Sequence, residues 1–360
     1  MRVLALAGDA GGARALLPVI RRLQRAPAVS VACRAYAAAQ VIWQDAGLAP
    51  GPVEPVSLDG VQRVLLGTSE QPQPWELKYI AQAEQQDVQT LSVLDHWQHY
   101  RERFTDGEAL ILPTLISVMD ERAKTEMLAA GFPEERLAVT GQPALDEVDA
   151  YRGSAQRVRA QHALAQRVGA DAGERLIVFA SQPLSMLQRA QQIGFHERDV
   201  LAQLVDALGR VLDRHGARAV LIVKPHPREA GQTMWLPLSS SPRLRLAVMD
   251  GPFASPLPLV AGCDLVTGMH SLLLLEACLL GRPVVSYQPG LKIADPLRSN
   301  EWGWSRAVTQ PEALERALEE ELFDAEARQR RQHVLDAIHL PGGAAERVAE
   351  LVMSKARAAC

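Results

Sequence analysis

The sequence has 360 residues, which is enough for two domains of ordinary size, each with its own hydrophobic core. Its 48% hydrophobic and 22% charged residues are typical of a soluble globular protein, and a net charge of -4 gives no reason to expect a nucleic-acid partner. No stretch approaches the roughly 18 apolar residues that span a bilayer. The four cysteines lack metal-ligand spacing, so we expect a reduced, cytoplasmic protein without a metal site.

The N-terminal part of the chain alternates between predicted strands and helices, as a doubly wound α/β domain does. Strands are predicted at residues 3–7, 29–33, 61–66, 90–94, 110–118 and 136–140. The first strand runs into a glycine-rich turn that opens a helix predicted at 13–25. The glycines lack the full dinucleotide spacing and no acidic residue stands at the ribose position, so nicotinamide binding is not expected.

A dense polar cluster that begins at Asp95 and His96 follows the fourth predicted strand. Because parallel strands end at one edge of a sheet, this cluster should share that edge with Asp9, Gly11 and Gly12 of the glycine-rich turn. A carboxylate or an imidazole in a dry site can act as a general base, so Asp95, His96 and Asp9 are catalytic candidates. The alternative is that Asp95 only caps a helix, with aromatic packing behind it.

A second series of strands is predicted at 176–180, 220–223, 243–248, 264–267 and 284–287, after a polar helix at 151–172. The strand at 220–223 stops at Lys224-Pro225-His226-Pro227, because a proline on each side of His226 ends the strand and prevents a helix. The strand at 264–267 is followed by His270 and by Ser271, which opens an apolar helix.

Ligands bind at the carboxyl ends of strands in open α/β sheets, and a helix N-terminus there suits phosphate. Lys224, His226, Arg228, His270 and Ser271 are therefore candidate binding residues. The plainer alternatives are that the His-Pro pair only makes a turn and that Ser271 only caps its helix.

Glu276 lies in the helix that Ser271 opens, with apolar residues around it. A buried carboxylate is costly unless something bonds it. A pair of sugar hydroxyls would do so, and so would a structural arginine.

The order and spacing of these motifs resemble the C-terminal half of GT-B nucleotide-sugar enzymes. HPRE followed by S-x4-E-A-x3-G-R-P-V is similar to strings in the non-hydrolysing UDP-N-acetylglucosamine 2-epimerases and in the capsule-type sialyl-, Kdo- and glycerophosphate transferases that carry a His-Pro motif. In those families the His and Ser contact the nucleotide phosphates and the Glu holds the ribose. By resemblance these roles fall on His226, Ser271 and Glu276.

The resemblance implies an α/β fold of the GT-B type, in which two Rossmann-like parallel-sheet domains face each other across a cleft. Residues 1–150 would form the acceptor-side domain, 151–172 a linker helix, 173–335 the donor-side domain, and 336–360 a helix that crosses back. The string VTGQPALD resembles the one that ends the first domain of the 2-epimerases. The loop after Tyr287 often contacts the donor sugar in such enzymes, which makes Gln288 and Asn300 candidates, with a solvated loop as the alternative.

The resemblance implies a bacterial, metal-independent glycosyltransferase without a cofactor. It would move a sugar from a nucleotide-activated donor, with CMP or UDP favoured, to a cell-surface glycan or glycoconjugate in polysaccharide biosynthesis. The alternative is a nucleotide-sugar 2-epimerase or its hydrolysing relative, but the Thr-Glu-Arg-Pro-Glu string of that family is missing here. The family's His near the glycine-rich turn is also replaced, by Ala13 and Arg14.

A third alternative is a non-catalytic binding subunit. The presence of His226, Ser271 and Glu276 argues against it. The resemblance is compatible with peripheral association with the inner membrane, where lipid-linked acceptors reside. It sets no oligomeric state.

Overall fold

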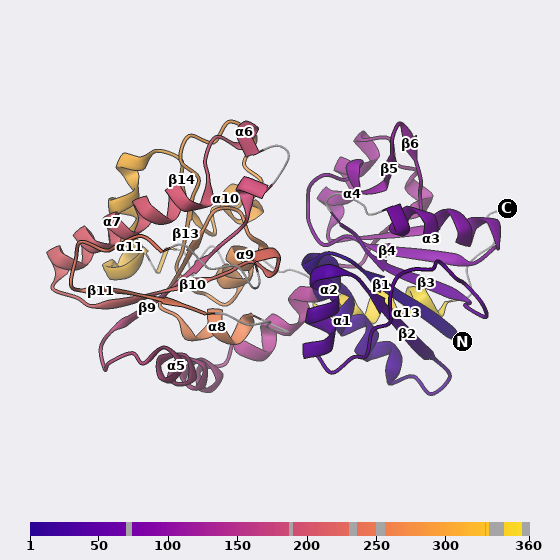
Figure 1. Ribbon diagram of the computed structural model, residues 1–360, viewed down its shortest axis with the longest axis horizontal. Helices are drawn as coiled ribbons and strands as arrows, with labels where there is room; N and C mark the ends of the chain where they lie inside the picture. The colour runs from indigo at the N-terminus through magenta and orange to yellow at the C-terminus, as the bar shows by residue number, and fades with distance from the viewer. Residues whose placement is uncertain are drawn as a thin grey trace. The chain divides into compact units, whose positions relative to one another are not determined.

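The computed structural model describes residues 1–69, 74–186, 190–229, 236–249, 256–327, 329–330 and 342–354. The chain forms two units, here called the N-terminal and the C-terminal unit (Figure 1). It passes from the first to the second between Glu147 and Val148, and the described residues 342–354 belong to the N-terminal unit again. Each unit contains a six-stranded parallel sheet. Within these ranges, no helix combines the length and the apolar character that crossing a membrane requires.

In the sheet of the N-terminal unit, later strands are added on both sides of the first strand. In spatial order its strands are β2 (Ser30–Ala35), β1 (Arg2–Ala7), β3 (Arg63–Gly67), β4 (Gln89–Val93), β7 (Leu115–Val118) and β8 (Leu137–Val139). The chain adds β2 on one side of β1 and then β3 on the other, so the turns after β1 and β3 flank a topological switch point. Ligands of open α/β sheets bind at such points.

Helices cover this sheet and close its core. They are α1 (Ala10–Gln24), α2 (Ala37–Asp45), α3 (Pro74–Gln85), α4 (Glu121–Ala129) and, from the far end of the sequence, α13 (Ala344–Met353). Leu16 and Ile20 of α1 are fully buried in one apolar cluster with Val348 of α13. Asp120 caps α4 by accepting a hydrogen bond from the backbone N–H of Ala123 at 2.7 Å, as a helix start at that position requires.

The last helix is attached to the N-terminal unit by polar contacts as well as by packing. Asp146 accepts hydrogen bonds from the backbone N–H groups of Ala344 (3.0 Å) and Ala345 (2.7 Å), which are the first residues of α13. Arg22 of α1 forms an ion pair with Glu346, and one of its N–H groups lies 2.6 Å from a carboxylate oxygen. The aspartate that ends the string VTGQPALD therefore holds the chain's last helix.

The sheet of the C-terminal unit has the strand order of the Rossmann fold. Its strands in space are β11 (Leu244–Val248), β10 (Ala219–Lys224), β9 (Arg175–Ala180), β12 (Leu265–Gly268), β13 (Val284–Tyr287) and β14 (Arg306–Val308). This is the order 3-2-1-4-5-6 in chain sequence, with the switch point between β9 and β12. β9, β10, β12 and β13 are buried almost throughout, as expected of parallel strands that are covered on both faces.

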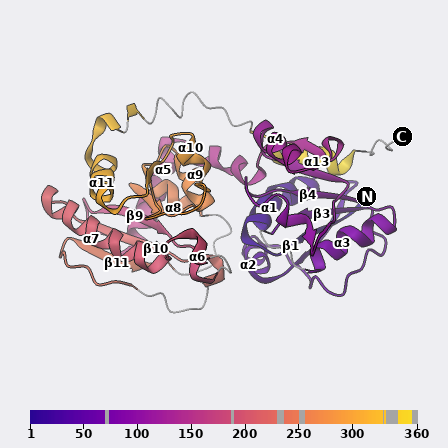
Figure 2. The same ribbon diagram turned by 90° about the horizontal axis from the view of Figure 1, so that it is seen from above.

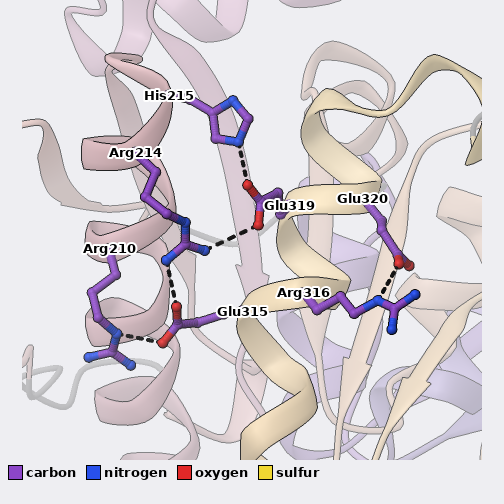
Figure 3. A network of polar contacts seen from close by, with 7 residues as sticks. All are labelled: Arg210, Arg214, His215, Glu315, Arg316, Glu319 and Glu320. Atoms are coloured by element: carbon purple, nitrogen blue, oxygen red, sulfur yellow. Dashed lines mark hydrogen bonds and ion pairs between the residues drawn. The ribbon is translucent and has the colours of Figure 1, made fainter.

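Helices lie on both faces of this second sheet (Figure 2). They are α5 (Ser154–Val168), α6 (Ala190–Ile193), α7 (Glu197–His215), α8 (Leu257–Gly262), α9 (Leu272–Leu279), α10 (Arg298–Glu301) and α11 (Leu314–Phe323). α7 and α11 share one apolar cluster with β9 and β10. Above that cluster, Arg210, Arg214 and His215 of α7 meet Glu315 and Glu319 of α11 in a surface ion-pair network (Figure 3).

The predicted α/β class with two Rossmann-like domains is confirmed, and each strand expected from the sequence is present, most of them with shifted ends. Three details differ. The strand expected at 110–118 begins only at Leu115, and its first expected residue, Leu110, belongs to the hairpin of β5 (Thr105–Asp106) and β6 (Ala109–Leu110). The helix expected at 151–172 ends at Gly169, which adopts a left-handed conformation with φ of 59°. β14 was not predicted.

Candidate functional site

The glycine-rich turn of the N-terminal unit is packed tightly against two neighbours. A Cβ atom at Gly11 would collide with Oδ2 of Asp95, and a Cβ at Gly12 would lie 2.9 Å from the backbone of Gly67 at the end of β3. Glycine at these positions thus lets α1 approach β3 and lets the Asp95 carboxylate lie against the first turn of α1. A negative charge there is favoured by the helix dipole.

Asp95 forms a buried ion pair with Arg103. Its Oδ1 atom accepts hydrogen bonds from Arg103 Nη1 at 2.6 Å and from Thr68 Oγ1 at 3.1 Å, and Nη1 also contacts Thr68 Oγ1 at 3.1 Å. The side chains of Arg103 and Asp95 are only 3% and 15% exposed. No helix starts at Asp95, so the helix-cap alternative is wrong. Arg103, for which no role was predicted, lies in the 3-10 helix η1 (Glu102–Phe104).

Burial raises the pKa of Asp95 above its ordinary value, and the nearby Asp9 carboxylate adds to this increase. The Arg103 guanidinium and the Thr68 hydroxyl oppose it. A carboxylate with a raised pKa is a stronger base, because a catalytic pKa closer to the working pH favours proton transfer. The burial of Asp95 and its polar neighbours can therefore adjust the pKa of a general base at this position.

Two further polar residues support this edge, and the sequence did not single them out. The Nε2 group of Gln142, from the string VTGQPALD, donates to the backbone carbonyls of Leu94 (3.2 Å) and Asp95 (2.9 Å). Glu76, which is 5% exposed, accepts a 2.6 Å hydrogen bond from Ser69 Oγ, and its Oε1 atom lies 3.4 Å from where a Cβ atom at Gly8 would be. Carboxylates thus lie against this turn at two places, Glu76 at Gly8 and Asp95 at Gly11.

His96 follows Asp95 and is half-buried, with its ring edge-on to Trp97 at a centroid distance of 6.3 Å. Asp9 occupies the N-cap position of α1 but makes no side-chain capping bond there. The N-terminal unit therefore gathers Asp9, Gly11, Gly12 and Asp95 at one edge of its sheet, as predicted, and His96 comes directly after Asp95 in the same segment.

In the C-terminal unit, His226 lies two residues after the end of β10 and immediately before the short 3-10 helix η5 (Pro227–Glu229). The backbone N–H of Arg228 donates to Nδ1 of His226 at 3.1 Å. The backbone N–H of His226 donates to the Glu229 carboxylate at 2.7 Å. Because Nδ1 accepts a hydrogen bond, the proton of the neutral ring lies on Nε2.

Burial lowers the pKa of His226 to about 3, and the positive charges of Lys224 and Arg228 lower it further in the same direction. The imidazole is therefore neutral at neutral pH in the ligand-free protein, and it offers an N–H donor rather than a positive charge. A bound anion would move this pKa back upward.

The turns after β9 and β12 are joined across the switch point. The side-chain oxygen of Gln182 accepts from the backbone N–H of His270 at 2.9 Å, and its amide nitrogen lies 3.3 Å from His270 Nδ1. Ser271 caps α9, since its Oγ accepts from the backbone N–H of Leu273 at 3.3 Å. Ser271 thus caps its helix, as the alternative expected, and a capping hydroxyl retains its own proton for a ligand.

Glu276 is fully buried within α9, as the apolar pattern around it predicted. Lys224 ends β10, and its ammonium group donates to the carbonyl of Pro225 at 3.2 Å. Arg228 is exposed. The carboxyl ends of β10, β9 and β12, which are adjacent in the sheet, therefore carry His226, Gln182 and Ser271 side by side.

Gln288 and Asn300 use their side chains to hold the loop after β13. The amide nitrogens of both residues donate to Ser286 Oγ, at 3.1 and 2.9 Å, and to the Asp295 carboxylate, at 2.9 and 2.8 Å. Gln288 is only 1% exposed, so the solvated-loop alternative is wrong at this position. These two amides organise the loop, and the substrate contact expected of them from the sequence stays a prediction.

No protein-family model matches the sequence, and no curated protein matches it. Solved structures do match over nearly its whole length. The UDP-GlcNAc 2-epimerase from Neisseria meningitidis bound to UDP-GlcNAc is 13% identical with a TM-score of 0.67, covering 97% of this chain and 99% of the epimerase. The wall teichoic acid polymerase TagF is 11% identical with a TM-score of 0.60, covering 98% and 88%. HepE from Anabaena in complex with UDP is 15% identical with a TM-score of 0.57, covering 98% and 99%.

The chain has a GT-B-like fold. Identities this low show the fold and leave the reaction to be argued from the site.

Proposed function

We propose that the protein is a glycosyltransferase that takes its sugar from a pyrimidine-nucleotide donor. The observation that carries this proposal is the group of hydrogen-bond donors at the β9–β12 switch point. There the neutral Nε2–H of His226, the Lys224 ammonium and the N-terminus of α9 with Ser271 lie at the carboxyl ends of β10 and β12, the two strands that flank β9. Such a set of N–H and O–H groups suits the phosphates of a nucleotide.

The chemistry follows from where charge develops. When the bond between the sugar and the phosphate breaks, negative charge grows on the leaving phosphate, and prearranged donors stabilise it. Since the ligand-free imidazole of His226 is neutral, its contribution is a hydrogen bond from Nε2. Glu276, fully buried in the same helix that Ser271 opens, would hold the ribose hydroxyls. The donor is a substrate, and we propose no metal and no cofactor.

The N-terminal unit would supply the base that activates the acceptor hydroxyl. Asp95 is the best candidate, because burial raises its pKa while Arg103 and Thr68 fix one carboxylate oxygen. We propose a glycan or glycoconjugate as the acceptor, in keeping with the polymerase activity named for TagF.

The second candidate is a nucleotide-sugar 2-epimerase. Two observations favour it, namely the likeness to the Neisseria meningitidis epimerase over nearly the whole chain, and the carboxylates of Asp95 and Glu76 that lie against the glycine-rich turn. Carboxylates are suited to moving a proton at the sugar C2.

The first experiment is thermal unfolding in the presence of CMP, CDP, UMP, UDP, GDP or dTDP. A nucleotide at about one hundred times its Kd stabilises the folded protein by about 2.7 kcal/mol, so the correct nucleotide class gives a clear rise in Tm. If none of the six raises the Tm, the donor site in the C-terminal unit is refuted.

The second experiment separates the two reactions. The protein is incubated in D2O with sugars activated by the nucleotide that binds. Nucleotide release that requires an added glycan acceptor identifies a transferase. Deuterium at C2 of the recovered sugar, without an acceptor, identifies an epimerase.

A further inference from the structure

His226 and Glu229 form a reciprocal cap on the 3-10 helix that follows β10. In the usual capping box, an N-cap Ser or Thr accepts from a backbone N–H of the first turn, and a Glu three residues later accepts from the N-cap N–H. Here Nδ1 of His226 takes the place of the hydroxyl and accepts from the Arg228 N–H at 3.1 Å. The Glu229 carboxylate accepts from the His226 N–H at 2.7 Å.

The same carboxylate reaches the neighbouring strand. Ser181, the residue after β9, donates its hydroxyl proton to Glu229 Oε1 at 3.1 Å, while Oε2 is the atom that caps His226. The backbone N–H of Ser181 donates to the Lys224 carbonyl at 3.0 Å. Glu229 therefore fixes the turn after β10 to the turn after β9, at the strand that borders the switch point.

This arrangement determines which ring nitrogen of His226 carries the proton. A free neutral imidazole exchanges between two tautomers, and the hydrogen bond to one nitrogen selects the tautomer that protonates the other. With Nδ1 occupied by the Arg228 N–H, Nε2 is the donor. Without the Glu229 carboxylate, the His226 N–H loses its partner and the turn that holds Nδ1 against Arg228 loosens.

We infer that Glu229 is a positioning residue that fixes the tautomer and direction of His226, so that Nε2–H is presented to an anionic phosphate group. The choice of phosphate as the ligand rests on the function proposed above. The control of the tautomer does not, because it follows from contacts within the C-terminal unit.

The charges around Glu229 agree with this role. Burial raises the pKa of Glu229, and the Glu197 carboxylate raises it further, while the His226 N–H, the Ser181 hydroxyl and the Lys224 ammonium oppose the increase. The contacts of Glu229 thus favour its ionised form and act against the effect of burial.

The test compares Glu229→Ala, which removes both carboxylate contacts, with Glu229→Gln, whose side-chain carbonyl can still accept from the His226 N–H. The tautomer is read from the 15N shifts of the His226 ring, assigned by its loss in His226→Gln. We expect the Nε2–H tautomer in the wild type and in Glu229→Gln, and a mixture in Glu229→Ala. If Glu229→Ala retains the wild-type tautomer, the inference is overturned.

The ligand half of the inference is tested on the same proteins with UDP as the probe. Loss of a charge-assisted hydrogen bond to the turn should raise the Kd of UDP about tenfold or more in Glu229→Ala, and far less in Glu229→Gln. If UDP, CMP, CDP and UMP all fail to bind the wild type, the assignment of phosphate is overturned. The tautomer measurement still decides the positioning role.

A loss of folding is separated from a loss of positioning by far-UV circular dichroism and urea unfolding. Should Glu229→Ala not fold, Glu229→Asp replaces it, because the shorter side chain keeps the charge but falls short of the His226 N–H. An unchanged tautomer and an unchanged Kd in a folded Glu229→Asp would equally overturn the inference.

Discussion

Oδ1 of Asp95 and Nη1 of Arg103 lie 2.6 Å apart in the N-terminal unit, and both side chains are largely buried. The seven residues between them return the guanidinium to the carboxyl end of β4, where Thr68 bridges the pair. The positive charge that balances the candidate base Asp95 therefore comes from the segment of chain that follows it.

Replacing Arg103 by Met should move the acid limb of the activity profile to higher pH. Arg103 lowers the pKa of Asp95, so its removal raises that pKa further, and the base becomes ionised only at higher pH. The measurement is kcat/KM against pH. Asp95→Asn should abolish the limb together with most of the activity. If the acid limb of Arg103→Met lies at the same pH as that of the wild type, Asp95 is not the base.

The same substitution should destabilise the protein by about 3–5 kcal/mol, because it leaves a buried carboxylate uncompensated. Urea unfolding measures this loss. The double variant Arg103→Met with Asp95→Asn should recover much of it, because no unpaired charge then remains. A double variant no more stable than the single one would contradict the ion-pair account.

His226→Ala should reduce turnover by about 10² or more, because it removes the donor that faces the leaving phosphate. His226→Gln, whose amide N–H can partly replace Nε2–H, should retain more activity than Ala. The check is kcat with saturating donor. Equal kcat in the wild type and in His226→Ala would remove His226 from the mechanism.

Glu276→Ala should mainly raise the KM for the donor, if the carboxylate holds the ribose. Comparison of donor KM and urea midpoint for Glu276→Ala and Glu276→Gln makes the distinction. A variant that unfolds instead would identify Glu276 as a structural partner in the core of the C-terminal unit.

Arg214 connects α7 to α11 by contacts at 2.7 Å to Glu315 and 3.2 Å to Glu319. Because these groups are exposed, Arg214→Ala should cost only about 1 kcal/mol, with a smaller cost at high salt. Hydrogen bonds from Arg214 and Arg210 lower the pKa of Glu315, and those from His215 and Arg214 lower that of Glu319.

The sign of the pH dependence follows from those lowered pKa values. The network's contribution is fully present above the ordinary glutamate pKa, and it disappears as the pH falls through the lowered values. The difference in stability between the wild type and Arg214→Ala should therefore vanish on acidification. Arg159→Ala, on the exposed face of α5, is the matched control. A difference that persists in acid would contradict the network.

Most of the fold could be predicted because buried parallel strands appear as short apolar runs. β14 was missed because it has only three residues, and two of them are exposed, as an edge strand allows. The hairpin of β5 and β6 was missed because two-residue strands carry no periodic pattern.

The candidate site was predictable only where a residue follows a strand directly. Asp9, Asp95, His226 and Ser271 were found for that reason. Arg103, Gln142 and Glu229 were not, because their importance lies in contacts made by turns, and a sequence pattern does not encode such contacts. The capping alternative for Asp95 failed for the same reason, since its partner is an arginine and not a helix start.

Because α13 completes the core around α1, the two ends of the chain depend on each other for folding. A fragment that stops at Glu147 would leave Leu16, Ile20 and Leu23 without the apolar partners Val348 and Val352, although it contains all six strands of its sheet. During synthesis, the N-terminal unit can reach its final packing only after the whole C-terminal unit has left the ribosome. The N-terminal unit is therefore synthesised before the C-terminal unit but completes its packing only after that unit has been synthesised.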